Sequence, residues 1–424
     1  MTRLHSPLVT VPPNADVRKP TRVAHSKRMA LFGKFGAENI GNECTLAALL
    51  ENIHRYRPQD EVLGVCTDPE DTRLRHKIRA VPIEAVVHRR GADRNILRFV
   101  LVRLPAEIVG WVKAVRALYG TDALMMTGTG MLTDSGESLL GFPYEIFKWV
   151  CAARCCGCRV RFIAVGVGPM RSGITRTFIH TALRLADYRS YRDNASRRRL
   201  QDQGFNAERD SVVPDLAFSL REPPALETSN GGARRVIGVG VMDNYGPPDT
   251  ERRRRAFFDT YIAKTAAFIV WLVRHDYVVR ILHGDVTCDE EPRWRLRSEL
   301  ARQGVGPDDG RVIDSDIRSF DDLWQQLTMT DIIISPRYHN LVLGMMLNKP
   351  VIALSYDYKN EALLTEAGLG EYWQRVEELD VERLIAQFEQ AERNSDAIRL
   401  LLENVAQRYR EQWKNEYSRI FADL

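Results

Sequence analysis

Short apolar runs alternate with helical patterns along the first half of the chain. A run that ends at Gly33 leads through a glycine-rich loop into the helical pattern of residues 45–53, and the same order of strand, loop and helix recurs. We expect strands at residues 29–33, 61–66, 123–126, 160–165 and 188–191. Alternating strands and helices favour a parallel sheet covered on both faces.

A second series of the same kind follows a linker. Residues 221–235, REPPALETSNGGARR, are rich in Pro, Gly, Ser and charge. Beyond them we expect strands at residues 236–241, 277–282, 331–334 and 350–354, with helices between them. The predicted fold class is therefore α/β, with two Rossmann-like lobes built on parallel sheets.

The expected domain boundaries follow from these patterns. At the carboxyl end, apolar residues at three- and four-residue spacing predict a helix that packs across the lobes. We divide the chain into a flexible basic arm, a first lobe, a linker, a second lobe and a carboxyl-terminal helix, at residues 1–28, 29–222, 223–235, 236–395 and 396–424.

Composition changes this picture little. A chain of 424 residues is too long for one core, and 60 Lys and Arg against 56 Asp and Glu give no case for nucleic-acid binding. Arginine clusters at 197–199 and 252–255 are interpreted as solvated faces, with an acidic polymer or lipid headgroups as the alternative. Seven cysteines in a chain this long, several of them in apolar runs, do not make a disulfide framework and suggest a reducing compartment. We expect neither a signal peptide nor a charge-free membrane span. These features favour the cytoplasm.

The densest group of chemically useful side chains is ISPRYHN, residues 334–340, between an expected strand and an apolar helical run. Arg337 offers a bidentate fork to an anion, and the free amides at a helix start add positive potential. His339 can transfer protons near neutral pH. The alternative is structural: Arg337 pairs with a buried carboxylate, and the backbone satisfies His339.

Other strand ends carry further candidates. Lys359 should open onto the same sheet edge as Arg337, unless it is simply solvated. Arg192 precedes a helix that Asp193 or Asn194 could cap, and it either binds ligand or pairs with Asp193 or Asp215.

His283 and Asp285 are either a catalytic pair or part of a turn with an incidental histidine. Glycine-containing loops at 33–42, 127–130 and 166–169 either let a ligand approach the backbone or only turn the chain.

Together and in order, these segments resemble the polysaccharide pyruvyl transferase family, from about Gly33 to Tyr372. The resemblance rests on NIGN at residues 39–42, the loop at 128–130, VGVGP at 165–169, YRD at 191–193 before Ser196, Pro214-Asp215, SPRYH at 335–339, PVI at 350–352, and Ser355-Tyr356 with Lys359. Gly-Thr-Gly at 128–130, where a triple glycine is commoner, and the long basic arm depart from the pattern and put the identity of the acceptor in question.

The resemblance implies a fold similar to GT-B glycosyltransferases, phosphoenolpyruvate as donor, a glycan hydroxyl pair as acceptor and a pyruvate ketal as product. Arg337, His339 and Arg192 take the positions of the family's motif residues. We expect His339 as general acid and base with His283 in reserve, Arg337 beside them, and no metal or cofactor. The expected substrate-binding residues are Arg192, Lys359, Gly36, Asn39, Asn42, Gly128, Gly130, Ser335 and Tyr356.

Two rival functions stay open: a nucleotide-sugar-dependent GT-B glycosyltransferase, and a non-catalytic protein that binds an anion or a biosynthetic partner. The acceptor is either a polymer, a lipid-linked saccharide or another glycan. A lipid-linked acceptor would bring the chain to the inner face of the membrane, with its basic arm as one means of attachment. The sequence predicts no oligomeric state.

Overall fold

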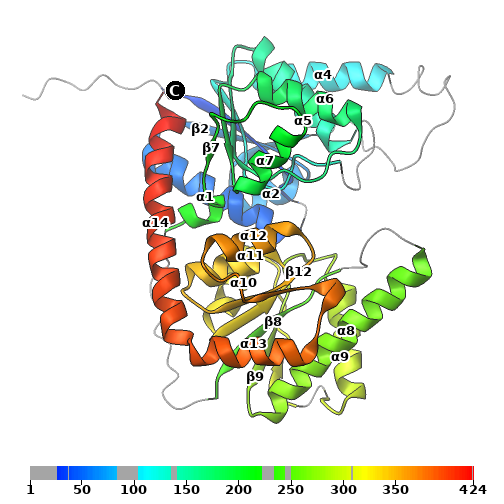
Figure 1. Ribbon diagram of the computed structural model, residues 1–424. Helices are drawn as coiled ribbons and strands as arrows, with labels where there is room; N and C mark the ends of the chain where they lie inside the picture. The colour runs from blue at the N-terminus through cyan, green and yellow to red at the C-terminus, as the bar shows by residue number, and fades with distance from the viewer. Residues whose placement is uncertain are drawn as a thin grey trace, which may run out of the picture.

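Two lobes lie one above the other, each built on a parallel sheet with helices on its faces (Figure 1). The computed structural model describes residues 26–36, 38–83, 104–134, 141–221, 234–243, 250–306, 309–422 and 424. The expected α/β class with two Rossmann-like lobes is confirmed. Most of the arm at 1–28 and of the linker at 223–235 lies outside the described residues.

Within the described residues, the first lobe has a seven-stranded sheet of order β3-β2-β1-β4-β5-β6-β7. Its strands are β1 (Arg28–Phe32), β2 (Glu61–Cys66), β3 (Arg79–Pro82), β4 (Ala123–Met126), β5 (Arg159–Val165), β6 (Tyr188–Tyr191) and β7 (Ser211–Val212). Its helices are α1 (Ile40–Tyr56), α2 (Pro69–His76), α4 (Leu104–Leu118), α5 (Phe142–Cys155), α6 (Gly173–Arg184), α7 (Asn194–Asp202) and the 3₁₀ helix η2 (Leu216–Ser219).

The second lobe has a six-stranded sheet of order β10-β9-β8-β11-β12-β13 in the same part of the chain. Its strands are β8 (Val236–Gly240), β9 (Val278–Leu282), β10 (Val312–Ile313), β11 (Ile332–Ser335), β12 (Val351–Ser355) and β13 (Trp373–Arg375). Its helices are α8 (Glu251–Arg274), α9 (Glu290–Arg302), α10 (Phe320–Thr328), α11 (Tyr338–Met346), α12 (Tyr358–Glu366), η3 (Val376–Glu378), α13 (Val381–Arg393) and α14 (Ser395–Phe421).

The central strands are mostly apolar because both of their faces are buried. In β1, Met29 and Leu31 belong to the core that also contains α1, whereas Ala30 and Phe32 face the core beneath α4, α5 and α6. The first of these cores continues through η2 and α14 into the second lobe. The two lobes therefore share a hydrophobic core.

Helix α14 runs along the side of the molecule from the second lobe back to the first (Figure 1). The indole Nε1 of Trp413 donates to the backbone oxygen of Asp215 at 3.2 Å, and the hydroxyl of Tyr417 lies 3.0 Å from that of Ser219. These contacts attach the end of the chain to η2 of the first lobe.

By length and composition, one helix of the described residues, α8, is apolar enough over Arg252–Arg274 to cross a membrane. Its side chains Phe258, Ile262 and Ile269 are buried in the core of the second lobe. A core helix of this kind meets the same criterion, so α8 is weak evidence for a membrane span.

The order of strands reverses direction once in each sheet, between β1 and β4 in the first lobe and between β8 and β11 in the second. In open α/β sheets, ligands bind at the carboxyl ends of the strands beside such a reversal. The segments that follow β1 and β4 are the glycine-containing loops at 33–42 and 127–130, and the segment that follows β11 contains Arg337 and His339.

Candidate active site

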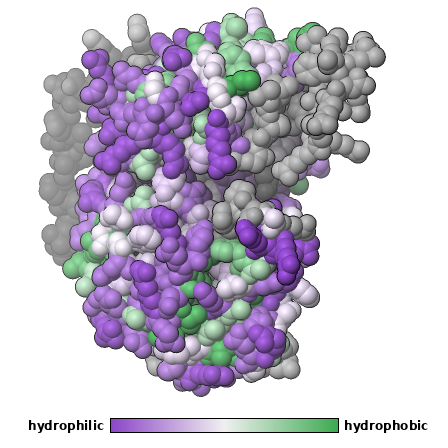
Figure 2. All heavy atoms as spheres, turned by 45° about the vertical axis from the view of Figure 1, so that its right-hand side comes forward, coloured by the Kyte–Doolittle hydropathy of each residue, from purple (hydrophilic) through white to green (hydrophobic). Residues whose placement is uncertain are grey.

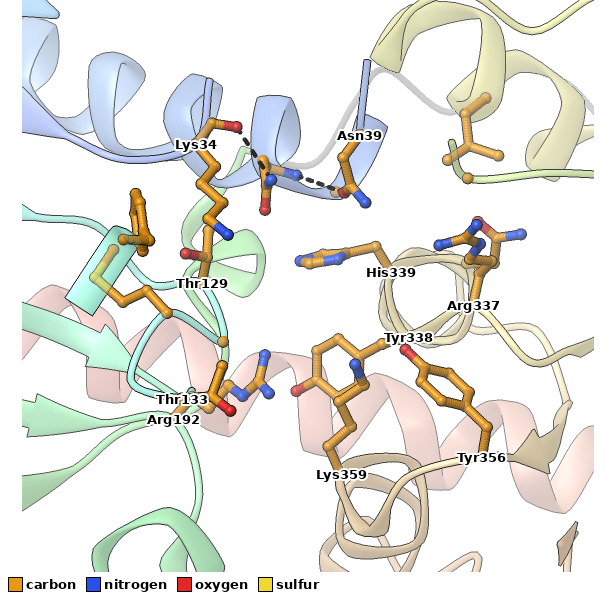
Figure 3. A pocket seen from close by; sticks show the side chains of 18 residues that line it. Lys34, Asn39, Thr129, Thr133, Arg192, Arg337, Tyr338, His339, Tyr356 and Lys359 are labelled. Carbon is orange, nitrogen blue, oxygen red and sulfur yellow. Dashed lines mark hydrogen bonds between the residues drawn. The ribbon is translucent and has the colours of Figure 1, made fainter. Parts of the chain in front are cut away.

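A cavity of about 240 Å³ lies between the lobes, at the point where the segments after β1, β4 and β11 meet (Figure 3). Figure 3 shows Lys34, Thr129 and Arg192 of the first lobe facing His339 and Tyr338 of the second. The described residues that line the cavity are Lys34, Asn39, Gly41, Asn42, Thr129, Gly130, Met131, Thr133, Phe142, Arg192, Gly284, Leu323, Arg337, Tyr338, His339, Asn340, Tyr356 and Lys359.

His339 stands in the first turn of α11, and a carboxylate from the opposite lobe lies behind it. Its Nε2 is 3.7 Å from Oδ1 of Asp215, which is fully buried. Burial alone would raise the pKa of Asp215, but the imidazole of His339, the guanidinium of Arg192 and the backbone amide of Ala217 lower the pKa below its ordinary value. Asp215 is therefore held ionised, and it can orient the imidazole and stabilise its protonated form.

The imidazole fits against the start of α1 because residue 41 is glycine. A Cβ atom at Gly41 would lie 2.1 Å from Nδ1 of His339. No real Cβ atom makes such a contact, so either the ring or the helix would have to shift. Gly41 thus sets how closely the two lobes approach at the cavity.

Arg192 supplies a buried cation on the opposite wall. Its side chain is 6% exposed, follows β6, and makes an ion pair from Nε to Oδ2 of Asp193 at 3.4 Å. Its guanidinium carbon stands 4.8 Å from the ring centre of Tyr338, and no hydrogen bond satisfies its buried Nε. Gly166 leaves the room for it, because a Cβ there would lie 2.6 Å from Nε.

The pKa of Arg192 is raised above its ordinary value. Burial works against this shift, whereas Tyr338 and the carboxylates of Asp193 and Asp215 favour the charged form. Asp193 pairs with Arg192 and also caps α7, where its side chain accepts a hydrogen bond from the backbone amide of Ser196 at 2.6 Å. A buried, permanently charged guanidinium that faces a cavity suits an anionic ligand.

Two lysines add positive charge to the cavity. Lys34 follows β1, and its Nζ lies 4.4 Å above the ring of Phe142. Lys359 begins α12 beside Tyr358, and its Nζ lies 4.7 Å from the ring centre of Tyr356. Together with Arg192, these groups give the cavity cations from both lobes.

Arg337 lines the cavity as well, but a buried carboxylate already holds its guanidinium. Its Nε donates to Oδ2 of Asp289 at 2.9 Å, and its Nη2 donates to Oδ1 of the same residue. Asp289 also accepts from the backbone amides of Gly284 and Asp285. The structural alternative that the sequence left open thus describes the main contact of Arg337, and its charge is largely offset by Asp289.

Asn340 is a cavity residue that the sequence analysis did not select. It is 0% exposed, and neither its amide nitrogen nor its amide oxygen has a hydrogen-bond partner. An unsatisfied buried amide is costly, so it marks a place for a ligand group that can both donate and accept. Its position next to His339 was the available signal, but an asparagine in an apolar helical run does not reveal whether its amide is paired.

Asn39 joins the two lobes at one edge of the cavity, and Asn42 holds the loop that precedes α1. Asn39 caps α1, and its Nδ2 donates to Oδ2 of Asp285 at 3.2 Å, while the Nδ2 of Asn42 donates to the backbone oxygen of Lys34 (Figure 3). Gly130 also lines the cavity, with the position of its missing Cβ 3.5 Å from Nη2 of Arg192.

Four of the expected site residues do not line the cavity. His283 is 1% exposed, and burial together with the charge of Arg293 lowers its pKa to about 4. A neutral, enclosed imidazole away from the cavity does not fit the reserve catalytic role expected for it.

The other three residues, Gly36, Gly128 and Ser335, make contacts that fix the course of the backbone. Gly36 has φ of +69° and packs against Asp68, and Gly128 packs against the backbone oxygens of β5. The hydroxyl of Ser335 accepts from the backbone amide of Arg337 at 3.1 Å. These contacts shape the loops around the cavity from outside it. In the described part of the chain, no group of three His, Cys, Asp or Glu residues is placed to hold a metal ion.

Comparison with known proteins agrees with this arrangement. The family model for polysaccharide pyruvyl transferase matches residues 39–358, from the cap of α1 to the start of α12. The curated proteins contain no match to the chain. The matched span includes Asp215, Arg192 and His339.

Several solved structures share the two-lobe fold at low sequence identity. The UDP-GlcNAc 2-epimerase from Neisseria meningitidis bound to UDP-GlcNAc has a TM-score of 0.54 at 11% identity, over 89% of this chain and 94% of its own. Anabaena HepE in complex with UDP has 0.56 at 13%, over 94% and 100%.

The lipopolysaccharide outer core galactosyltransferase WaaB has a TM-score of 0.52 at 12% identity, over 94% of this chain and 100% of its own. At such identities the likeness concerns the fold alone, which is that of GT-B-like enzymes. The match to the family model shows more than the fold, because it covers most of the sequence and residues on both walls of the cavity. The chain therefore belongs to the polysaccharide pyruvyl transferase family and is a transferase.

Proposed function

We propose that the chain transfers pyruvate from phosphoenolpyruvate to two hydroxyls of one sugar and forms a cyclic pyruvate ketal. The observation that carries this proposal is the buried guanidinium of Arg192, which faces the paired His339 and Asp215 across the interlobe cavity. The site thus combines an anion-binding group and a proton-transfer group within one small space.

The charges of the cavity suit this donor. Phosphoenolpyruvate carries a carboxylate and a phosphate, and each needs a cation once it leaves water. Arg192 can hold one of them bidentately, while Lys34 and Lys359 approach as point charges from the two lobes. Arg337 contributes less charge than the sequence suggested, since Asp289 pairs with it.

The size of the cavity also favours a small donor. Its volume of about 240 Å³ is below the roughly 300–1,000 Å³ of pockets that enclose drug-sized ligands. A nucleotide sugar is a ligand of that larger size. A donor as small as phosphoenolpyruvate therefore fits within this volume.

The reaction uses His339 as general acid and general base. The imidazolium gives its proton to the methylene carbon of the donor, which makes C2 electrophilic, and a sugar hydroxyl adds to C2 and returns a proton to the imidazole. The bond between C2 and the phosphate oxygen then breaks, and the second hydroxyl adds to C2. Of the two protons that the diol loses, one stays on the new methyl group and one leaves with phosphate, so no oxidant or reductant is required.

Asp215 and Asn340 support these steps. Asp215 stabilises the imidazolium between proton transfers, as a buried carboxylate does when it is paired with a catalytic histidine. The unpaired amide of Asn340 can donate to one sugar hydroxyl and accept from another. It is our candidate for aligning the hydroxyl pair.

Phosphate release from phosphoenolpyruvate, measured with a panel of glycan acceptors, tests the proposal. Acceptor-dependent release is expected, and His339→Gln should reduce it by roughly 100-fold or more because general acid and base catalysis is lost. His275→Gln, a change at an exposed histidine of the second lobe, is the matched control. Consumption of a nucleotide sugar with phosphoenolpyruvate untouched would overturn the proposal in favour of a GT-B glycosyltransferase.

A further inference from the structure

Helix α4 exposes an apolar face on the first lobe and contributes no residue to the lining of the cavity. Of the twelve large hydrophobic side chains that are exposed among the described residues, five belong to this helix and the residue after it: Ile108, Val109, Val112, Val115 and Tyr119. Ile108, Val112, Val115 and Tyr119 follow a spacing of four, three and four residues, which places them along one side of the helix. Single exposed apolar residues are ordinary, but a row of them marks an interaction surface.

Aromatic side chains extend this face across the neighbouring helices. Trp111 of α4 meets Phe147 of α5 edge-on at 6.4 Å between ring centres, and Phe147 stacks on Phe178 of α6 at 5.1 Å. All three rings are only partly buried, and Ile174 of α6 is exposed nearby in the sequence. Figure 2 shows small groups of hydrophobic atoms among hydrophilic ones at the upper end of the first lobe.

The charges on the exposed face of α4 are all positive. Lys113 and Arg116 are exposed, and both lie beside the apolar row on the side of α4 that faces β3. The carboxylate of α4, Glu107, is turned toward α5, where it accepts from the hydroxyl of Tyr144 at 3.0 Å and lies 3.7 Å from Nζ of Lys148. The face therefore offers hydrophobic area and positive charge with no exposed carboxylate of the helix beside them.

A groove lies at the edge of this face, between α4 and the edge strand β3. It encloses about 280 Å³, and its floor is formed by apolar groups that include Ile83, Ala117 and Trp149. Lys113 and Arg116 line the same groove. An apolar slot with two cations along it matches an amphiphile, whose chain would fill the slot while its phosphate meets the lysine and the arginine.

We propose that the face of α4 binds the surface of an anionic phospholipid bilayer, with the β3–α4 groove receiving part of a lipid. A symmetric contact between two copies of the chain fits less well. It would bring Lys113 and Arg116 of both copies together, and the exposed face of α4 has no carboxylate to pair with them. Phospholipid headgroups supply the missing negative charge, and the apolar row can enter the headgroup region.

The surface does not depend on the function proposed for the cavity. It is nevertheless suited to an enzyme whose acceptor is attached to a lipid, since it would keep the chain where that acceptor is concentrated. Because binding to vesicles is measured without donor or acceptor, failure of this inference and failure of the proposed function are distinguishable.

Flotation of the full chain with vesicles of equal parts phosphatidylglycerol and phosphatidylcholine tests the inference. Wild-type protein should float with these vesicles and much less with pure phosphatidylcholine. Ile108→Glu with Val112→Glu should lower the fraction bound by roughly tenfold or more, because two apolar contacts are replaced by charges that anionic lipid repels. Lys113→Glu with Arg116→Glu should do the same, because each basic residue adds about fivefold to binding at an anionic surface.

The matched control is Leu400→Glu, since Leu400 is 62% exposed and Ile108 is 58% exposed. This variant should float like the wild type, and thermal melting should show that all variants are folded. Equal flotation of wild type and α4 variants overturns the inference. Absence of wild-type flotation, with a dimer by light scattering that Ile108→Glu dissociates, overturns it too and assigns the face to a second copy.

Discussion

Nε2 of His339 lies 3.7 Å from Oδ1 of Asp215, although the two residues belong to different lobes. The pair exists only while the lobes keep their relative position. Contacts on both sides maintain that position: Asn39 donates to Asp285 at one edge, and the hydroxyl of Tyr358 donates to the backbone oxygen of Val167 at 2.6 Å at the other. The contacts that hold the two lobes together therefore also hold the site together.

Replacing the buried carboxylate of Asp215 should reduce turnover without weakening the binding of phosphoenolpyruvate. In Asp215→Asn the shape is kept, but the negative charge that stabilises the imidazolium of His339 is lost. We expect kcat to fall by about 100-fold or more, while the KM for phosphoenolpyruvate changes by less than about threefold. Steady-state kinetics on the folded variant separate the two parameters. A rise in KM with unchanged kcat would mean that Asp215 acts on donor binding instead.

Adding one carbon atom at Gly41 should displace the catalytic ring. The Cβ of Gly41→Ala would lie 2.1 Å from Nδ1 of His339, so either the imidazole or the start of α1 has to move, and both change the position of the ring in the cavity. A shift of this order in a catalytic group costs about 100-fold in rate. Gly173→Ala, at the start of α6 with only Arg176 within 4 Å of the new atom, is the control. Equal activity of the two variants would contradict the packing that we describe.

Arg192 should determine donor affinity. Loss of hydrogen bonds to a charged group costs about 1.5–3 kcal/mol, so Arg192→Ala should weaken binding of phosphoenolpyruvate by roughly 10- to 150-fold. Isothermal titration calorimetry measures this directly, without an acceptor. Arg198→Ala, which removes an exposed guanidinium from α7, should bind donor normally. Unchanged affinity of the Arg192 variant would return that residue to a purely structural role.

His283 should make stability depend on pH. Its pKa in the folded chain is about 4, below the ordinary value of about 6.5, chiefly because it is buried. Between these two values the unfolded chain takes up a proton that the folded chain does not, so stability is complete above about pH 6.5 and falls as the pH is lowered toward 4. The full difference corresponds to roughly 3 kcal/mol.

His283→Gln removes this contribution because glutamine does not titrate. Urea unfolding of both proteins at pH values from about 7 to about 4 gives the comparison. As the pH falls, the free energy of unfolding should decrease more for the wild type than for the variant. Parallel curves would show that His283 is not enclosed as described.

Much of the fold could be predicted because its central strands are apolar on both faces and stand between clear loop signals. The nine strands expected at residues 29–33, 61–66, 123–126, 160–165, 188–191, 236–241, 277–282, 331–334 and 350–354 are present as β1, β2, β4, β5, β6, β8, β9, β11 and β12. The edge strands β3, β7, β10 and β13 have only two to four residues. Segments this short show no recognisable alternation of polar and apolar residues. They become strands because they pair with the neighbouring strand of the sheet.

The site was harder to predict because its decisive contacts join distant segments. The sequence placed Arg337 and His339 at one strand end, which the structure shows beside the cavity. It could not show that Asp289, 48 residues away, neutralises Arg337, or that Asp215 stands behind His339. His283 also follows a strand, yet its side chain is enclosed. A strand end fixes where the backbone emerges, and packing decides which side chains reach the ligand.

Nuclear magnetic resonance of a glycan recovered after incubation with phosphoenolpyruvate labelled with ¹³C at C2 tests the central claim most directly. We predict a labelled ketal carbon bonded to two oxygens of one sugar, with one phosphate released per ketal, and no such signal from His339→Gln. Transfer of a sugar from a nucleotide sugar, with labelled phosphoenolpyruvate recovered intact across the acceptors tested, would contradict it.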